Sequence, residues 1–157
     1  MIEVRLREVV DSDLDLFYEF GCDEEANRMA AFTSPEPHDR TRFAAHWARI
    51  RAEPTVVNRA ILVDGAVVGS IAKYELDGEP EITYWIGRAY WGRGIASAAL
   101  RAFLPLLAQR PLFARAALEN IGSLRVLAKC GFARVGEDVG FANARGAEIA
   151  EAILRLD

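Results

Sequence analysis

The chain has 157 residues, of which 52% are hydrophobic and 27% charged, and a formal net charge of −4 at pH 7. This balance is typical of a soluble globular protein and excludes intrinsic disorder, a collagen-like chain and a disulfide-rich scaffold. The length predicts a single domain over residues 1–157 with its own hydrophobic core. The acidic balance argues against a nucleic-acid partner recruited by an overall basic field.

Signals for disulfides, metals and membranes are sparse. Cys22 and Cys130 lie far apart, and no Cys/His cluster has the spacing of a zinc site. We therefore expect two reduced thiols and no metal site. The first residues carry no apolar signal-peptide core, and no apolar run is long enough to span a membrane. These absences predict a cytoplasmic protein with no membrane partner.

The first third of the chain predicts one strand followed by helices. Apolar and polar residues alternate over 2–7, which is typical of a half-buried strand. Capping residues at 11–12 begin a first helix, and a second helical pattern covers 24–31. After a proline-containing break at 34–37, apolar residues at helical spacing over 43–50 predict a third amphipathic helix.

The middle of the chain predicts three antiparallel strands in series. Apolar runs over 59–63 and 66–71 flank Asp64-Gly65, and Asp-Gly between such runs is a strong hairpin signal. A second Asp-Gly turn at 77–78 precedes a third strand over 81–86.

The last third alternates helices and strands. The predicted elements are a helix that opens at the Gly92 turn and is shortened or kinked by Pro105, a strand over 112–118, a short helix capped by Asn120 and ended by Gly131, and strands over 133–142 and 148–156. The whole order predicts an α/β (α+β) fold: a single mixed, mostly antiparallel sheet of about seven strands with helices on both faces.

The Gly92-Arg93-Gly94 turn between a strand and a helix is a candidate anion site. Glycines permit a tight turn and a close approach of ligand to backbone, and free N–H groups at a helix start suit a phosphate. An ordinary strand-to-helix turn is an alternative interpretation. A dinucleotide-binding oxidoreductase is a weaker one, because Ser97 stands where the third glycine is expected and the preceding strand is antiparallel.

Two motifs in sequence order resemble the GNAT superfamily of acyl-CoA-dependent N-acyltransferases. Residues 90–96, YWGRGIA, are similar to the Gln/Arg-x-x-Gly-x-Gly/Ala signature, with Trp91 departing from it at the first position. Residues 120–132, NIGSLRVLAKCGF, resemble the Asn-x-x-Ser…Lys-x-Gly-Phe pattern of the branch that includes the ribosomal-protein N-terminal acetyltransferases. The resemblance covers essentially the whole chain.

The resemblance implies a GNAT fold with a splayed central strand pair and acetyl-CoA as co-substrate. Backbone amides from Trp91 to Ser97 would hold the pyrophosphate, and the pantetheine arm would pair with the strand edge at Trp85 and Ile86. The implied cofactor-binding residues are Trp85, Ile86, Trp91, Gly92, Arg93, Gly94, Ile95, Ala96, Ser97 and Asn120. Arg125 and Lys129 are weaker candidates for a phosphate contact, with a solvated helix face as the simpler interpretation.

The resemblance also implies two catalytic residues. Glu81, at the start of the strand before the glycine turn, is the favoured general base. The competing carboxylates are Glu75, Asp77, Glu79 and Glu119. The tyrosine that serves many relatives as general acid is replaced by Leu127, so Ser123 inherits a role near the thioester sulfur. Ser123 is equally well placed as a simple helix-start residue.

The sequence therefore predicts an acetyl-CoA-dependent N-acetyltransferase acting on a primary amine, either a protein N-terminal α-amine or a small molecule. The segments 32–47 and 141–146 are expected to contact that acceptor. A non-catalytic acyl-CoA-binding or sensor module is the main alternative, because the usual tyrosine is missing. The resemblance also allows a homodimer, for which the residues themselves give no independent signal.

Overall fold

The structure is a computed structural model that describes residues 2–157; Met1, part of the predicted domain, lies outside them. Seven strands form one sheet in the order β1-β2-β3-β4-β5-β7-β6. The strands are β1 (Arg5–Arg7), β2 (Val57–Val63), β3 (Ala66–Leu76), β4 (Glu79–Ile86), β5 (Leu112–Ala117), β6 (Ala133–Ala142) and β7 (Ala147–Leu156). Neighbours pair antiparallel except β4 and β5, which run parallel. The predicted mixed, mostly antiparallel sheet is confirmed.

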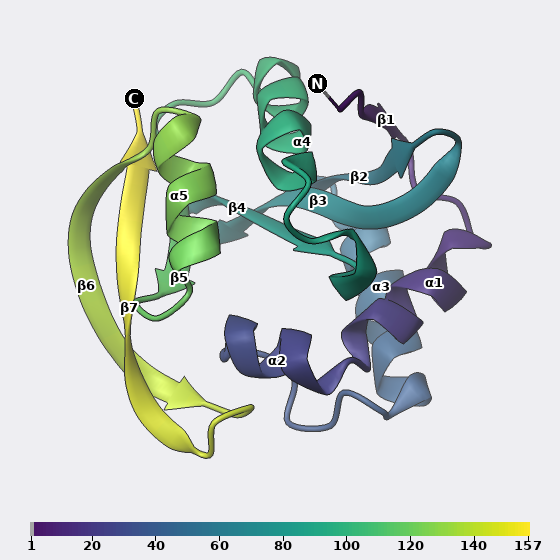
Figure 1. The fold of residues 1–157 in the computed structure, drawn as a ribbon, viewed down its shortest axis with the longest axis horizontal. Coiled ribbons are helices and arrows are strands. Elements are labelled where there is room, and N and C mark those ends of the chain that lie inside the picture. The colour runs from purple at the N-terminus through teal and green to yellow at the C-terminus, as the bar shows by residue number, and fades with distance from the viewer. Residues whose placement is uncertain (1) are drawn as a thin grey trace.

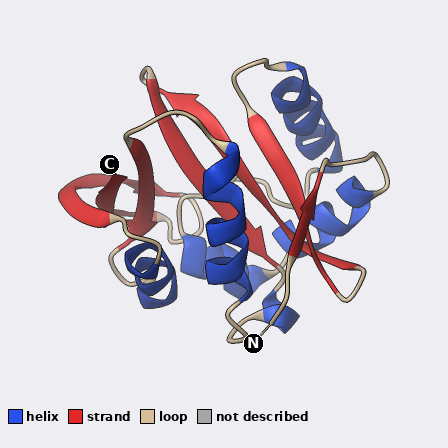
Figure 2. Ribbon diagram, turned by 90° about the horizontal axis from the view of Figure 1, so that it is seen from above, coloured by secondary structure: helices blue, strands red, loops and turns tan. Residues whose placement is uncertain are grey.

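Five α-helices cover the two faces of this sheet within residues 2–157. They are α1 (Asp13–Gly21), α2 (Glu24–Ala30), α3 (Arg40–Ala52), α4 (Ile95–Phe103) and α5 (Ile121–Lys129). In Figures 1 and 2, α4 and α5 lie on one face, and α1 and α3 lie on the other. No helix in the described part of the chain combines the length and apolar composition that a bilayer crossing requires.

Each face of the sheet has its own apolar core, because side chains alternate along a strand. On the α4–α5 face, Ile82 and Ile86 of β4 pack with Phe103 of α4 and Leu127 of α5. On the other face, Phe17 of α1 stacks on Trp47 of α3 with ring centroids 5.1 Å apart. The sheet is therefore a rigid platform that holds helices on both sides.

The predicted helix ends agree with the structure, whereas the first strand is shorter than expected. Gly131 follows α5 with a φ of +94°, and α4 stops at Phe103 before a 3-10 turn that contains Pro105. The strand predicted over 2–7 is reduced to β1, because only Arg5–Arg7 finds partners on β2. Ile2 and Val4 still pack against the core without joining the ladder.

Candidate active site

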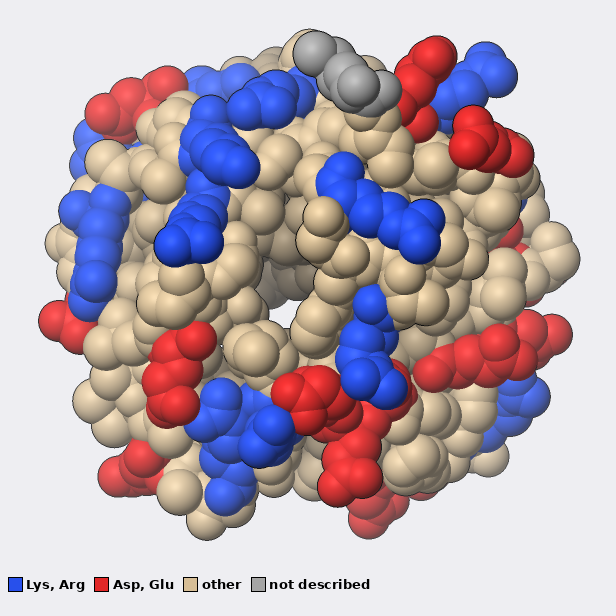
Figure 3. Space-filling model, in the orientation of Figure 1, with Lys and Arg blue, Asp and Glu red and all other residues tan. Residues whose placement is uncertain are grey.

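The parallel strands β4 and β5 part from each other soon after they meet. They pair only at Glu81 with Phe113 and at Ile82 with Ala114, although β4 continues to Ile86. Figure 3 shows an opening that passes through the molecule at the place where Figure 1 has the space between α5, β4 and α2. The splayed strand pair implied by the resemblance is confirmed, and the opening allows access from both faces of the sheet.

The free backbone edge of β4 belongs to Tyr84 and Ile86. Gly87 donates its N–H to the Val68 carbonyl at 2.8 Å, and Ser70 lies opposite Trp85. Because hydrogen-bonding direction alternates along an antiparallel ladder, the N–H and C=O groups of Trp85 point to β3 and those of Tyr84 and Ile86 point into the opening. The family resemblance implies this edge at Trp85 and Ile86. The structure agrees for Ile86 but puts Tyr84 in place of Trp85.

The turn between β4 and α4 has an open backbone cradle. Gly92 and Gly94 have φ values of +77° and +78°, and a Cβ added at either would meet no atom within 4 Å. Gly94 is the N-cap of α4 and makes no side-chain cap, so the first-turn N–H groups of this helix face outward without that partner. The Trp91 indole donates to the Ile86 carbonyl at 2.9 Å and ties the turn to the end of β4. This arrangement suits an anion held by backbone amides.

A cavity of about 600 Å³, here called the α4–α5 cavity, joins the opening to this turn. Of the predicted site residues, it is lined by Trp85, Ile86, Trp91, Gly92, Gly94, Ile95, Ala96, Ser97, Asn120 and Ser123. Arg93 is not in the lining, and its guanidinium lies 5.8 Å from the ring centroid of Tyr90. Arg125 and Lys129 of α5 do line the cavity, and Figure 3 shows Lys and Arg side chains over α5 near the opening.

The start of α5 brings three polar groups together in this cavity. Asn120 caps the helix, its Oδ1 accepting the Ser123 N–H at 3.2 Å. The hydroxyls of Ser123 and Tyr84 are 2.7 Å apart, within hydrogen-bond distance. Burial raises the pKa of Tyr84 to about 12, and the bond to Ser123 offsets part of that rise. Tyr84 is not among the predicted site residues, although it lies two residues from both Ile82 and Ile86 and therefore faces the α5 side of the sheet with them.

Glu81 is buried, only 4% exposed, and lines neither the α4–α5 cavity nor the cavity on the opposite face described below. Arg115 of β5 lies between three carboxylates, its nitrogens 3.4 Å from Glu81, 3.2 Å from Asp138 and 3.0 Å from Glu151. Burial raises the pKa of Glu81, while the Arg115 charge and hydrogen bond pull it down in part. The carboxylate predicted to act as the base is therefore desolvated and held in place by Arg115.

Glu81 shares a strand face with Trp85. Side chains two residues apart point the same way along a strand, so Glu81, Thr83 and Trp85 all face the α1–α3 side of the sheet. Thr83 is exposed between its two neighbours. Water can therefore reach the face of β4 between the carboxylate and the opening.

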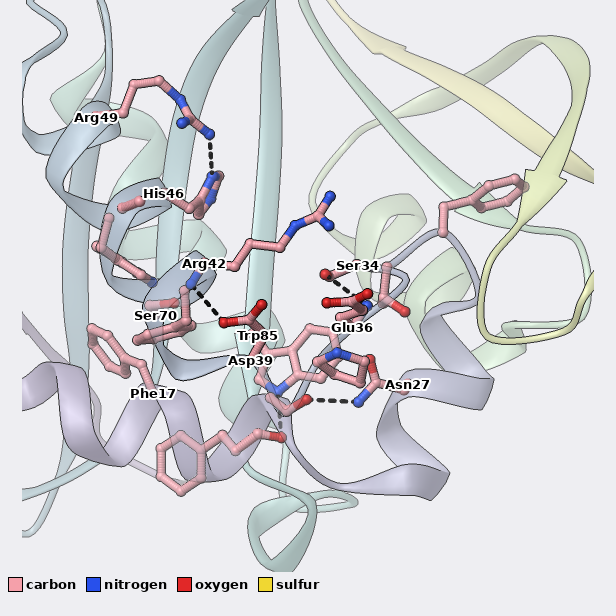
Figure 4. Close-up of a pocket in the computed structure, with 18 residues that line it drawn as sticks. Phe17, Asn27, Ser34, Glu36, Asp39, Arg42, His46, Arg49, Ser70 and Trp85 are labelled. Atoms are coloured by element: carbon pink, nitrogen blue, oxygen red, sulfur yellow. Dashed lines mark hydrogen bonds between the residues drawn. The ribbon is translucent and has the colours of Figure 1, made fainter.

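A second cavity of about 720 Å³, here called the α1–α3 cavity, lies on that face. Figure 4 shows Trp85 at its floor, with side chains from α1, α3 and the segment between α2 and α3 around it. Trp85 lines both cavities, and its indole N–H donates to the Phe20 carbonyl at 3.2 Å. The two cavities thus meet at this side chain.

Charges of both signs line the α1–α3 cavity. Glu36 and Asp39 supply carboxylates, and Arg42 and Arg49 supply guanidiniums. Arg42 points into the space in Figure 4. Burial and the neighbouring Arg49 lower the pKa of His46, which keeps its imidazole neutral near pH 7.

Polar and apolar groups of the predicted acceptor segment meet in the same cavity. Thr33 presents a buried Oγ1 that has no hydrogen-bond partner among the described residues. Phe32 and Trp47 also line this cavity, whereas Phe141 is exposed and His38 is outside the lining.

A family model and a curated relative match the sequence. The model described as "Acetyltransferase (GNAT) domain" matches residues 3–133. The relative, from Bacillus subtilis (strain 168), is called "Putative ribosomal N-acetyltransferase YdaF" and is 33% identical over 68 residues. That match covers 41% of this chain and only 37% of the relative.

Solved structures share the fold at lower identity. Mycobacterium smegmatis RimJ in complex with CoA-disulfide superposes with a TM-score of 0.79 at 23% identity, covering 98% of this chain and 81% of the other. Spermidine N-acetyltransferase from Vibrio cholerae, in complex with CoA and spermine, has a TM-score of 0.79 at 15% identity, covering 97% and 95%. At these identities the likeness establishes the shared fold alone.

Proposed function

Because the chain belongs to the GNAT acetyltransferase domain family, we propose that it acts as one catalytic domain that moves an acetyl group from acetyl-CoA to a primary amine. The observation that carries this proposal is the opening between β4 and β5, which joins the α4–α5 cavity to the α1–α3 face beside Trp85. A thioester bound from one side and an amine arriving from the other would meet there, as direct attack requires.

The α4–α5 cavity has the groups that a CoA thioester needs. The glycine cradle and the start of α4 would hold the pyrophosphate. The Tyr84 N–H and C=O and the Ile86 N–H would pair with the pantetheine amides, since the Ile86 carbonyl already accepts from the Trp91 indole. Arg125 and Lys129 add positive charge along the same cavity. The structural neighbour RimJ was solved with CoA-disulfide and the spermidine enzyme with CoA, which supports the same class of ligand here.

The amine must lose a proton, and we assign that task to Glu81 acting through water. A neutral amine attacks the thioester carbon, and the proton that it sheds must leave as the amide forms. A carboxylate with a raised pKa is a better proton acceptor than an ordinary one, and burial raises the pKa of Glu81. Since Glu81 lines neither large cavity, water at the exposed Thr83 face provides the connection.

The charge balance of the α1–α3 cavity favours an α-amine acceptor over a polyamine. A polyamine carries several positive charges and is best bound by an excess of carboxylates. Here Glu36 and Asp39 are matched by Arg42 and Arg49. The N-terminus of a peptide, with one amine and many backbone carbonyls, suits this mixed lining and the Thr33 hydroxyl, which no group of residues 2–157 satisfies. The Bacillus subtilis relative is named as a putative ribosomal N-acetyltransferase, which supports a macromolecular acceptor.

Thermal-shift titration tests the cofactor assignment. A ligand at 100 times its Kd stabilises the folded state by roughly 2.7 kcal/mol, which should raise the Tm by about 5–10 °C for a chain of this size. Acetyl-CoA should give this shift and NAD should not. A shift with NAD alone, or none with millimolar acetyl-CoA, would overturn the assignment.

A non-catalytic acyl-CoA-binding module is the second candidate. It is favoured by one observation: Leu127, at the position of the usual tyrosine, is 1% exposed and packs in the core. That module would bind acetyl-CoA but release no CoA thiol with any amine. Amine-dependent turnover would therefore exclude it.

A further inference from the structure

Tyr84 and Ser123 form a pair of hydroxyls in the wall of the α4–α5 cavity. Tyr84 comes from β4 and Ser123 from the first turn of α5, yet their oxygens are only 2.7 Å apart. Both residues line the α4–α5 cavity. Two elements distant in sequence thus place two hydroxyls in one hydrogen-bonded unit on the cavity wall.

The pair stands where β4 and β5 separate. Tyr84 is two residues beyond Ile82, the last residue of β4 that pairs with β5. Its phenol therefore reaches α5 across the start of the opening, next to the backbone edge described above. Leu127, where the family resemblance implies a tyrosine, is buried in the core and offers no hydroxyl.

We propose that Tyr84 is a positioning residue that directs the Ser123 hydroxyl at the thioester sulfur. A phenol is more acidic than an aliphatic alcohol, so Tyr84 is the better donor of the two and Ser123 Oγ accepts. The proton of Ser123 is then free to donate a hydrogen bond into the cavity. Hydrogen bonds in such a chain polarise one another and strengthen the outer bond. This inference rests on the proposed function.

The pair donates a hydrogen bond to the sulfur but does not transfer a proton to it. A CoA-like thiol has a pKa of about 8.5, well below that of a buried phenol. Neither Tyr84 nor Ser123 therefore gives up its proton to the departing thiolate. As the carbon–sulfur bond breaks, Ser123 donates a hydrogen bond to the sulfur on which charge develops. The proton that Glu81 takes from the amine nitrogen finally returns through water and neutralises the thiolate.

The test is a double-mutant cycle with separate measurements of binding and turnover. Tyr84→Phe removes only the phenol oxygen, and Ser123→Ala removes the hydroxyl that it orients. Each single variant should lower kcat on the order of tenfold, the effect of one hydrogen bond to a developing charge. The KM and Kd for acetyl-CoA should stay within about twofold, because the bond is made in the transition state.

Non-additivity is the decisive readout. If Tyr84 acts through Ser123, the double variant should be no slower than Ser123→Ala alone. Ser123→Thr, which keeps a hydroxyl, should retain most of the wild-type kcat. Tyr18→Phe removes another bonded phenol, one that donates to the His38 carbonyl and lines neither cavity. This control variant therefore shows how far the loss of one phenol hydrogen bond lowers Tm when the site itself is unchanged.

Two results would overturn the inference. One is an unchanged kcat in Tyr84→Phe, and the other is a double variant in which the two losses multiply. A wild-type protein without any amine-dependent turnover would instead show that the proposed function has failed. The two kinds of failure are therefore distinguished by the wild-type control.

Discussion

At the scale of single residues, the fold changes the chemistry of Glu81. A glutamate near the start of a strand is usually solvated, but Glu81 is enclosed beside Arg115 and shares that guanidinium with Glu151. Burial is the leading cause of its raised pKa, and the Arg115 contacts limit the rise. The same enclosure that makes Glu81 a stronger base also keeps it in a fixed place.

Replacing Glu81 by glutamine should lower kcat by about 10²-fold while the Kd for acetyl-CoA is unchanged, since a general base contributes on this scale. In the wild type, kcat/KM should fall as the pH is lowered through the raised pKa of Glu81, because the base must be ionised. This acidic limb should lie above the range of an ordinary glutamate and be absent from the variant. Steady-state rates across pH measure both effects.

Two controls isolate the Glu81 limb. The pH profile of kcat/KM also contains a limb from ionisation of the acceptor amine. That limb should move to another pH when an acceptor of different amine pKa is used, whereas the Glu81 limb should stay at the same pH. Glu151→Gln removes a carboxylate from the same Arg115 cluster without touching the proposed base. Because the Glu151 charge raises the pKa of Glu81, this variant should shift the limb to lower pH and keep turnover. A Glu81→Gln enzyme with wild-type kcat would remove Glu81 from the mechanism.

At the scale of elements, the start of α4 depends on two glycines with positive φ. Gly94→Val should abolish acetyl-CoA binding, because its side chain would project into the open cradle where the pyrophosphate is placed. Gly65→Val is the matched control: Gly65 has a φ of +80°, equally open surroundings and a place in the β2–β3 turn outside both cavities.

Both glycine variants should lose at least ~1–2 kcal/mol of stability from the left-handed backbone. Only Gly94→Val should lose the thermal shift with acetyl-CoA. Equal affinity in the two variants would contradict the placement of the phosphate. Calorimetric titration with acetyl-CoA on both purified variants gives the comparison.

The junction of β1 and α1 is held by one ion pair. Both oxygens of Asp13, a 2% exposed residue, accept from Arg7 at 2.7 and 2.9 Å, and the Val10 N–H donates to the same carboxylate at 2.9 Å. The Arg7 hydrogen bond is the main reason that the pKa of Asp13 is lowered. This carboxylate therefore joins the first strand to the helix that borders the α1–α3 cavity.

Asp13→Asn should lower the free energy of unfolding by about 1–2 kcal/mol near pH 7, since the Arg7 side chain is 39% exposed and water screens part of the pair. The folded-state pKa is depressed, so the stabilisation is present above the ordinary aspartate pKa and is lost as pH falls through the lowered value. Urea unfolding at pH 7 and near pH 3 should show the difference between the two proteins shrink in acid.

At the scale of the whole molecule, local chemistry made the fold largely predictable. Asp64-Gly65 turns the β2–β3 hairpin, Asn120 caps α5 and Gly131 ends it, all as their residue types predict. The glycine turn before α4, which its residue types also predict, lines the α4–α5 cavity. Each of these features depends on a few consecutive residues.

The parts that sequence reasoning missed depend on register and on distant contacts. The Tyr84–Ser123 pair requires knowing that β4 and α5 meet across the splay. The free edge of β4 starts at Tyr84, not Trp85, because of the phase of its pairing with β3. The enclosure of Glu81 follows from Arg115, which lies 34 residues away in the chain. The homodimer allowed by the resemblance stays a prediction, and a measurement of molecular mass in solution would test it.

Amine-dependent release of CoA thiol reports directly on the proposed acetyl transfer. The wild-type protein is mixed with acetyl-CoA and a short peptide bearing a free α-amine, and a peptide of the same sequence with a blocked α-amine is the control. We predict thiol release with the free peptide and not with the blocked one, N-terminal acetylation of the free peptide detected by mass spectrometry, and slower thiol release with spermidine. Equal thiol release with the blocked peptide, or none with any amine although acetyl-CoA binds, would contradict this prediction.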